Sequence, residues 1–225
     1  MSDRTTRLII PIVVVTGVAA VGVGVGWSGP PASPPEPTPD PPAAVSSVPS
    51  LGLVRIDYRL ERQRGHASNQ IAVWIEDAAG QHVRSLFATS FTAEGGYARR
   101  PMSLPAWRGS ARWEQASDEL VEAVARPAQD SGTHSLYWDG LDEFGAPVAP
   151  GTYRFLVEGN LRWENRVLFT GTVAVGSAPA AGDASAEYAP PGAEAHAGML
   201  AEVRAEFLPG ERMQPDMISA YSRGS

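Results

Sequence analysis

Residues 138–159 read WDGLDEFGAPVAPGTYRFLVEG, and this stretch carries the most distinctive structural signal in the chain. Asp side chains accept hydrogen bonds from backbone N–H groups of their own turn, and glycine adopts positive φ angles. The stretch therefore favours a tight turn between two strands. We expect a β-hairpin in which Trp138 and Tyr153 meet across the strands as core anchors. The other hairpin residues are Asp139, Gly140, Asp142, Gly145 and Gly151.

The carboxylates of this stretch admit a second interpretation. Asp139, Asp142 and Glu143 would form a calcium site if they converged, because hard cations bind clustered carboxylates. Their spacing lacks the repeated ligands of a recognised calcium loop. We therefore expect them to serve the turn, and we expect neither a metal nor another cofactor.

Outward from this stretch, the chain consists mainly of strand patterns. Residues 54–60, VRIDYRL, alternate apolar and charged side chains, which is the period of a half-buried strand. Among these residues, only 117–125 have a helical pattern, with Ser117 as the N-cap. These features predict a mainly β domain over residues 51–176, an immunoglobulin-like antiparallel β-sandwich with one short inserted helix. The other predicted strands are 71–75, 83–91, 135–141, 152–159 and 166–175.

An uncharged apolar run over residues 8–27 is long enough to cross a bilayer at about 1.5 Å per residue. Arg4 and Arg7 precede it and no positive charge follows before Arg55, so the positive-inside rule places residues 1–7 in the cytoplasm. We expect a retained single transmembrane helix, a signal anchor, with the main domain extracytoplasmic. A cleaved signal peptide, which shares the charged start, is the alternative.

The two flanks of the domain differ from it in composition. Residues 28–50 are rich in proline and predict an extended, stiff linker. Residues 177–225 are rich in Ala, Gly and Pro and largely acidic, so we expect most of this tail to be disordered. A short helix over residues 197–207 is the exception, because their apolar side chains fall on one helical face.

Composition excludes several functions. The net charge is -7, which opposes electrostatic binding to nucleic acid. The absence of cysteine excludes disulfides, thiolate metal sites and a cysteine nucleophile. The four histidines lack metal-ligand spacing, and neither a nucleophile elbow nor a phosphate-binding loop is present in the predicted domain. We therefore expect a protein that is not an enzyme.

One cluster has the composition of a recognition surface, because arginine beside aromatic residues is typical of interface hot spots. The alternative is that its two tryptophans cover an open end of the sandwich while its arginines are solvated. The candidate partner-binding residues are Arg99, Arg100, Trp107, Arg108, Arg112 and Trp113.

Three motifs carry a resemblance to a known family. Residues 138–159 resemble the hairpin of the DUF2271 family of exported bacterial proteins. Residues 71–86, IAVWIEDAAGQHVRSL, resemble the opening strands of that family, and residues 104–113, LPAWRGSARW, resemble its middle. The hairpin alone also resembles, more loosely, that of flagellar hook-capping proteins.

The DUF2271 resemblance implies an immunoglobulin-like periplasmic protein of no established activity, found beside flavin-linked membrane redox proteins. It therefore suggests a membrane-tethered, extracytoplasmic, non-catalytic binding or accessory module whose protein partner is a flavin-dependent redox membrane protein. Residues 124–132 depart from the family pattern and lack the threonine that would accept a covalent flavin. The alternative function is a structural or assembly protein of the cell envelope that acts through self-association.

Overall fold

The computed structural model describes residues 51–63, 69–162, 164–196, 198–214 and 217. In that part of the chain, none of the helices combines the length and the apolar character needed to cross a membrane. The predicted cytoplasmic segment 1–7, transmembrane helix 8–27 and linker 28–50 lie outside the described residues.

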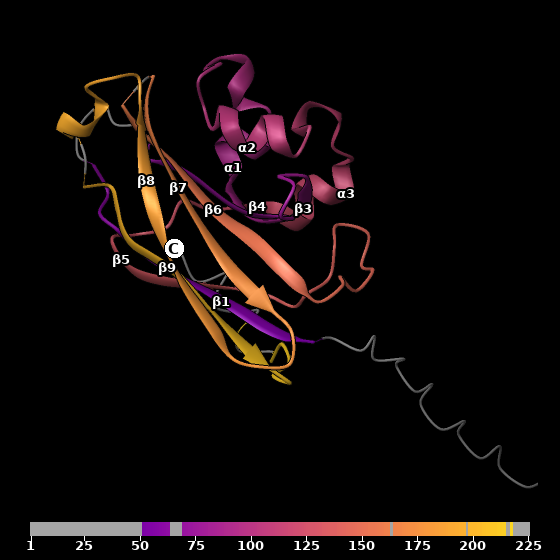
Figure 1. The fold of residues 1–225 in the computed structure, drawn as a ribbon. Helices are drawn as coiled ribbons and strands as arrows, with labels where there is room; N and C mark the ends of the chain where they lie inside the picture. Colours follow the sequence, from indigo (N-terminus) through magenta and orange to yellow (C-terminus); the bar gives the residue numbers. More distant parts are fainter. Residues whose placement is uncertain (1–50, 64–68, 163, 197, 215–216, 218–225) are drawn as a thin grey trace, which may run out of the picture. The chain divides into compact units, whose positions relative to one another are not determined.

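The described strands join in one nine-stranded, hydrogen-bonded sheet (Figure 1). Their order along the sheet is β4-β3-β2-β6-β7-β8-β9-β1-β5. Neighbouring strands are antiparallel except β3 and β4, which are parallel. The strands are β1 Gly52–Leu60, β2 Gln70–Glu76, β3 His82–Thr89, β4 Ala125–Arg126, β5 Gly132–Trp138, β6 Gly151–Arg162, β7 Asn165–Val175, β8 Ala180–Ala189 and β9 Leu200–Pro209.

This sheet curls around one large hydrophobic core. Ile56 of β1, Val73 of β2 and Phe155 of β6 belong to the same buried cluster although their strands are distant in the sheet order. Strand β5, at one end of that order, contacts β3 near the other end. The prediction of a mainly β domain is confirmed. The hydrogen bonding shows one continuous curled sheet, and it does not show the two separate sheets of the predicted immunoglobulin-like sandwich.

The described helices are short, and five of the six lie between β3 and β4. The predicted helix over residues 117–125 is confirmed as α3, and the Ser117 hydroxyl caps it by accepting a hydrogen bond from the Leu120 N–H at 3.3 Å. The sequence did not predict α1 or α2, because four and six residues are too few to show a helical period. The helices are α1 Ser90–Ala93, η1 Gly96–Ala98, α2 Pro105–Ser110, η2 Trp113–Gln115, α3 Asp118–Val124 and η3 Ala193–His196.

The tail differs most from the prediction. Residues 177–225 were expected to be mostly disordered with a helix over 197–207, but they contain β8 and β9. Strand β9 lies between β8 and β1. It therefore joins β1 and β5 to the rest of the sheet. The predicted domain boundary at residue 176 is therefore wrong, and the strands of the domain extend to Pro209.

A β-bulge explains the mistaken helix. Leu200 is buried in the core, and Glu202 then adopts a left-handed φ of 56° where the pairing of β9 with β1 shifts register. The extra residue resets the alternation, so that Val203 and Phe207 also face the core. Leu200 and Val203 are consequently three residues apart, and this spacing imitates a helical face.

The predicted hairpin of residues 138–159 is also corrected. Trp138 and Tyr153 do pack against each other edge to face, with ring centroids 5.0 Å apart. Their strands are not paired: β5 pairs with β1, whereas β6 pairs with β2 and β7. Residues 139–150, here called the crossing loop, therefore lead from the end of the sheet order to its middle.

The crossing loop has the turn chemistry that the sequence predicted. Asp142 Oδ1 accepts hydrogen bonds from the N–H groups of Phe144 and Ala146 at 2.9 and 2.8 Å, and Gly145 adopts a φ of 80°. A β-bridge between Leu141 and Pro147 closes this turn within the loop. At the start of the loop, the Asp139 carboxylate accepts a hydrogen bond from the Leu141 N–H. Gly140 adopts a φ of 73°, and its carbonyl accepts a hydrogen bond from the Val148 N–H. At the end of the loop, Gly151 begins β6.

Candidate protein-binding surface and its polar network

Residues 90–124 form a helical cap over the outer face of β2, β3 and β6. In Figure 1, α1, α2 and α3 gather on one side of the sheet beside these strands. A second hydrophobic cluster fills the space between them, so this part of the sheet is buried on both faces. The sheet supplies Ala72, Trp74, Ala88 and Leu156 to this cluster, and the cap supplies Ala93, Leu104, Trp107, Trp113 and Val124.

Two buried polar side chains of β6 hold the cap. The Glu158 carboxylate accepts hydrogen bonds from the N–H groups of Ala106 and Trp107 at 3.2 and 2.9 Å, in the first turn of α2. The Asn160 amide accepts from the Leu104 N–H at 2.8 Å and donates to the Met102 carbonyl at 2.9 Å. These bonds satisfy backbone groups that the start of α2 would otherwise leave buried and unpaired.

Burial raises the pKa of Glu158, because removal of the carboxylate from water disfavours its charged form. The two backbone hydrogen bonds oppose this shift, and so do the charges of Arg166 and Arg108. The Arg166 guanidinium lies 3.9 Å from the carboxylate, whereas the backbone N–H groups are closer. Glu158 is therefore a buried acid whose charge state is coupled to the attachment of the cap.

The two tryptophans of the predicted partner-binding cluster are core residues. Trp107 and Trp113 are 0% and 2% exposed, and their rings pack 4.4 Å apart. Each indole N–H has an internal acceptor, the Ser85 hydroxyl for Trp107 and the Ala93 carbonyl for Trp113. The placement of both rings on a partner surface is therefore wrong. The alternative that they pack internally is correct, although they lie under the cap and not at an open end of a sandwich.

Arg108 is fixed within the cap. Its guanidinium donates to the carbonyls of Ser103 and Pro101 and to the Glu114 carboxylate, and it lies 4.6 Å from the centroid of the Tyr97 ring. Only 11% of its side chain is exposed. Arg108 therefore connects the loop before α2 with Glu114, which follows α2. It is not a solvated surface arginine.

The remaining arginines of the cluster are exposed. Arg99 and Arg100 both place their guanidinium groups over the ring of Phe91, at 5.6 and 5.0 Å from its centroid. Met102, two residues further along, is 42% exposed. We call Phe91, Arg99, Arg100 and Met102 the arginine patch. Arg112 is exposed at a left-handed position before η2, and no described contact joins it to this patch.

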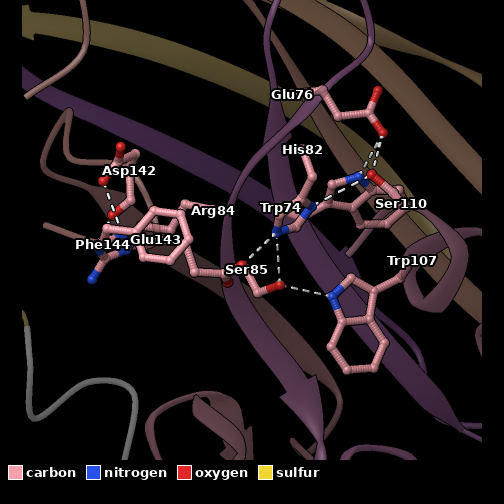
Figure 2. A network of polar contacts seen from close by, with 10 residues as sticks. All are labelled: Trp74, Glu76, His82, Arg84, Ser85, Trp107, Ser110, Asp142, Glu143 and Phe144. Atoms are coloured by element: carbon pink, nitrogen blue, oxygen red, sulfur yellow. Dashed lines mark hydrogen bonds and ion pairs between the residues drawn. The ribbon is translucent and has the colours of Figure 1, made fainter. Parts of the chain in front are cut away.

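A polar network connects α2 to the β2–β3 hairpin (Figure 2). The Glu76 carboxylate accepts hydrogen bonds from the Trp74 indole at 2.9 Å and from the Ser110 hydroxyl at 2.7 Å. Nδ1 of His82 lies 3.4 Å from that hydroxyl, and its Nε2 lies 3.2 Å from the Ser85 hydroxyl. The network therefore runs from one buried carboxylate through a serine to a histidine.

The crossing loop completes this network. Oε2 of Glu143 lies 3.6 Å from Nε2 of His82, and the Glu143 N–H donates to the Val83 carbonyl at 2.9 Å. No described residue donates to the buried Oε1 of Glu143. On the far side, Arg154 pairs with the other oxygen of Glu76 at 2.9 Å. His82 thus stands between two carboxylates, one reached directly and one reached through Ser110.

This network joins β2, β3, α2 and the crossing loop through their side chains. Ser85 is only 5% exposed and its hydroxyl already accepts the Trp107 indole N–H. Among the described residues, no group of three or more acidic or histidine side chains is arranged to hold a metal ion. Asp142 accepts hydrogen bonds within its own turn, and the Glu143 carboxylate lies beside His82.

Sequence reasoning missed most of this site, although one signal was available. Glu76 and His82 are directly opposite each other in the β2–β3 pairing, and they lie just beyond the adjoining ends of the predicted strands 71–75 and 83–91. Glu158 and Asn160 gave no such signal. They alternate with core residues along β6, and a sequence pattern assigns that outer face to solvent.

One protein family matches most of this domain. A family model described as "Predicted periplasmic protein (DUF2271)" matches residues 53–189. Neither a curated protein nor a solved structure matches the chain. The matched residues run from the second residue of β1 to the end of β8 and include the whole cap, and β9 follows them.

Proposed function

Because the chain belongs to the DUF2271 family of predicted periplasmic proteins, we propose that its domain is a non-catalytic, extracytoplasmic binding module that docks onto an acidic protein partner through the arginine patch. The observation that carries this proposal is the pair of exposed guanidinium groups of Arg99 and Arg100 over one Phe91 ring. Arginine and methionine are enriched at protein interfaces, and Met102 adds exposed apolar surface to the patch.

The stacking also favours binding on energetic grounds. An arginine that is already held over a ring loses less rotamer freedom when a partner orders it. A carboxylate on the partner would then gain bidentate hydrogen bonds from a guanidinium group whose orientation is set in advance. The cap that carries these arginines is itself anchored by Glu158 and Asn160, so the patch rests on a fixed support.

The proposal includes a membrane tether and a class of partner. Residues 8–27 would serve as the retained transmembrane anchor, and residues 28–50 would serve as the spacer. The partner would be a flavin-linked membrane redox protein, as the family resemblance suggests. The alternative, a structural protein of the envelope that acts through self-association, is favoured by a different feature, the 95% exposed ring of Phe144.

Purification of the full chain from mild detergent, followed by identification of recovered proteins, tests this function. We compare the wild type with an Arg99→Ala, Arg100→Ala double variant. Loss of two interface arginines should lower partner recovery at least about tenfold. The thermal midpoint should not change, because both side chains are exposed.

The matched control is Arg59→Ala with Arg204→Ala, which removes the same charge from exposed positions on β1 and β9. Arg59 pairs with the exposed Glu202, and Asp57 keeps its ion pair with Arg55 when Arg204 is removed, so both changes should affect stability little. The control should recover the partner as the wild type does. Equal loss in both double variants would mean that net charge and not the patch determines binding, and undiminished recovery in the Arg99, Arg100 variant would refute the proposed surface.

A further inference from the structure

Phe144 stands at the tip of the crossing loop with its ring 95% exposed. The turn that carries it is fixed by two hydrogen bonds to the Asp142 side chain and by the positive φ of Gly145. The preceding residue, Glu143, is tied to Val83 through its N–H. The backbone that carries the ring is therefore ordered, so a contact has to order only the Phe144 side chain itself.

The surface around this ring is unusually apolar for a loop. Residues 144–151 read FGAPVAPG and contain no charge, and Phe144 to Pro147 are all exposed. A large aromatic ring that leads such a segment is the type of side chain that anchors protein interfaces.

A pocket that fits such a ring lies on the same part of the molecule. It has a volume of about 240 Å³ and is open to one side, between α3, β3 and the crossing loop. Leu86, Leu120 and Val124 are among its apolar lining residues. A cavity of about 150 Å³ lined by apolar side chains holds benzene, so this pocket has room for a phenyl ring.

The charges at this site complement one another. Arg84 and Arg126 line the pocket together with Asp139 and Glu143, and Asp142 adds a further carboxylate to the loop. A surface that carries both signs in this way is self-complementary when a two-fold axis brings two copies of it together. By contrast, three acidic residues and no basic residue in the loop oppose its insertion into an anionic lipid surface.

We propose that two copies of this chain associate by exchanging Phe144, so that the ring of each copy enters the pocket of the other. Glu143 lines the pocket and immediately precedes Phe144, so the ring and the pocket adjoin on one surface. A two-fold axis between them places each ring opposite the pocket of the other copy. This contact is separate from the arginine patch and does not depend on the proposed partner.

The test uses the full chain in mild detergent with two different affinity tags, and it measures the dissociation constant of the self-complex by sedimentation. Phe144→Ala removes the ring, and Ala123→Glu blocks the pocket from an exposed position on α3 that suits glutamate. Each variant alone should weaken self-association at least about thirtyfold. At a concentration where the chain is monomeric, circular dichroism should show that both variants melt like the wild type.

Mixing the two variants supplies the decisive comparison. A Phe144→Ala chain keeps its pocket and an Ala123→Glu chain keeps its ring, so the mixed pair regains one of the two contacts. It should bind more tightly than either variant binds itself. The proposal is overturned if the mixed pair is no tighter, if Phe144→Ala leaves self-association unchanged, or if the loss appears only in binding to phosphatidylglycerol vesicles.

Discussion

The buried carboxylate of Glu158 accepts a hydrogen bond from the backbone N–H of Trp107 at 2.9 Å, and this bond ties β6 to the first turn of α2. The same carboxylate accepts a second bond from Ala106, so both of its oxygens are used. A single acidic residue thus joins the sheet to the cap that carries the arginine patch. Its protonation should therefore affect the stability of the domain.

Stability should rise as the pH falls through the range in which folded Glu158 titrates. Because the pKa is raised in the folded state, the folded chain binds more protons than the unfolded chain between the two pKa values. This contribution is complete below the ordinary pKa of 4.5 and is lost as the pH rises through the folded pKa. Denaturant unfolding at about pH 5 and about pH 8 measures the difference.

Glu158→Gln supplies the control, because it removes the titration and keeps most of the shape. The unfolding free energy of the wild type relative to this variant should be larger near the lower pH. A constant difference across the range would show that Glu158 does not titrate as its burial predicts.

Arg108 and Arg112 should differ in their effect on stability although they are four residues apart. Arg108→Ala leaves the carbonyls of Pro101 and Ser103 without their donors and should destabilise the fold by about 1–3 kcal/mol. Arg112→Ala removes an exposed side chain and should change stability by less than about 0.5 kcal/mol. Thermal melts of the two variants decide between this assignment and a cluster in which both arginines are solvated.

The outcome for this cluster shows what a sequence pattern can and cannot predict. The alternation in β1 and the cap at Ser117 are local signals, and both predictions are confirmed. Trp107 and Arg108 are neighbours in sequence, yet the Trp107 side chain lies in the core, whereas the Arg108 side chain binds the carbonyls of the loop before α2. Which of them faces inward depends on where the cap docks, and that information is not local.

The same limit explains the error in the tail. Strand β9 is hidden in the sequence because the bulge at Glu202 breaks its period of two. Strand β8 is hidden because residues 180–189, AAGDASAEYA, contain few large apolar side chains. It pairs with β7 and β9 through its backbone, which a hydrophobic pattern does not report.

Trp138→Ala should destabilise the domain by about 3–5 kcal/mol, because the ring is fully buried against Tyr153 and its indole N–H donates to the Leu141 carbonyl. Phe144→Ala, in the same loop, is the matched control. That ring is 95% exposed, so stability should change by less than about 0.5 kcal/mol. Denaturant unfolding of both variants at a concentration where the chain is monomeric gives the comparison. Equal effects would mean that Trp138 does not anchor the crossing loop.

The last prediction concerns where the folding unit ends. A fragment of residues 51–176 lacks β8 and β9, although β9 pairs with β1 over most of its length. Its removal exposes the core that Leu200, Val203 and Phe207 cover, and burial of such side chains contributes about 1.5–3 kcal/mol each. That loss is comparable with the whole stability of a typical domain, about 5–15 kcal/mol.

We therefore expect the 51–176 fragment to show no cooperative thermal transition by circular dichroism. A fragment of residues 51–214 keeps all nine strands and should melt cooperatively with a β-type spectrum. The shorter fragment also leaves the edges of β7 and β1 unpaired, so it should aggregate where the longer one stays monomeric or dimeric. A cooperative, monomeric melt of the shorter fragment would mean that β8 and β9 are an appendage of the domain and that its core is complete without Phe207.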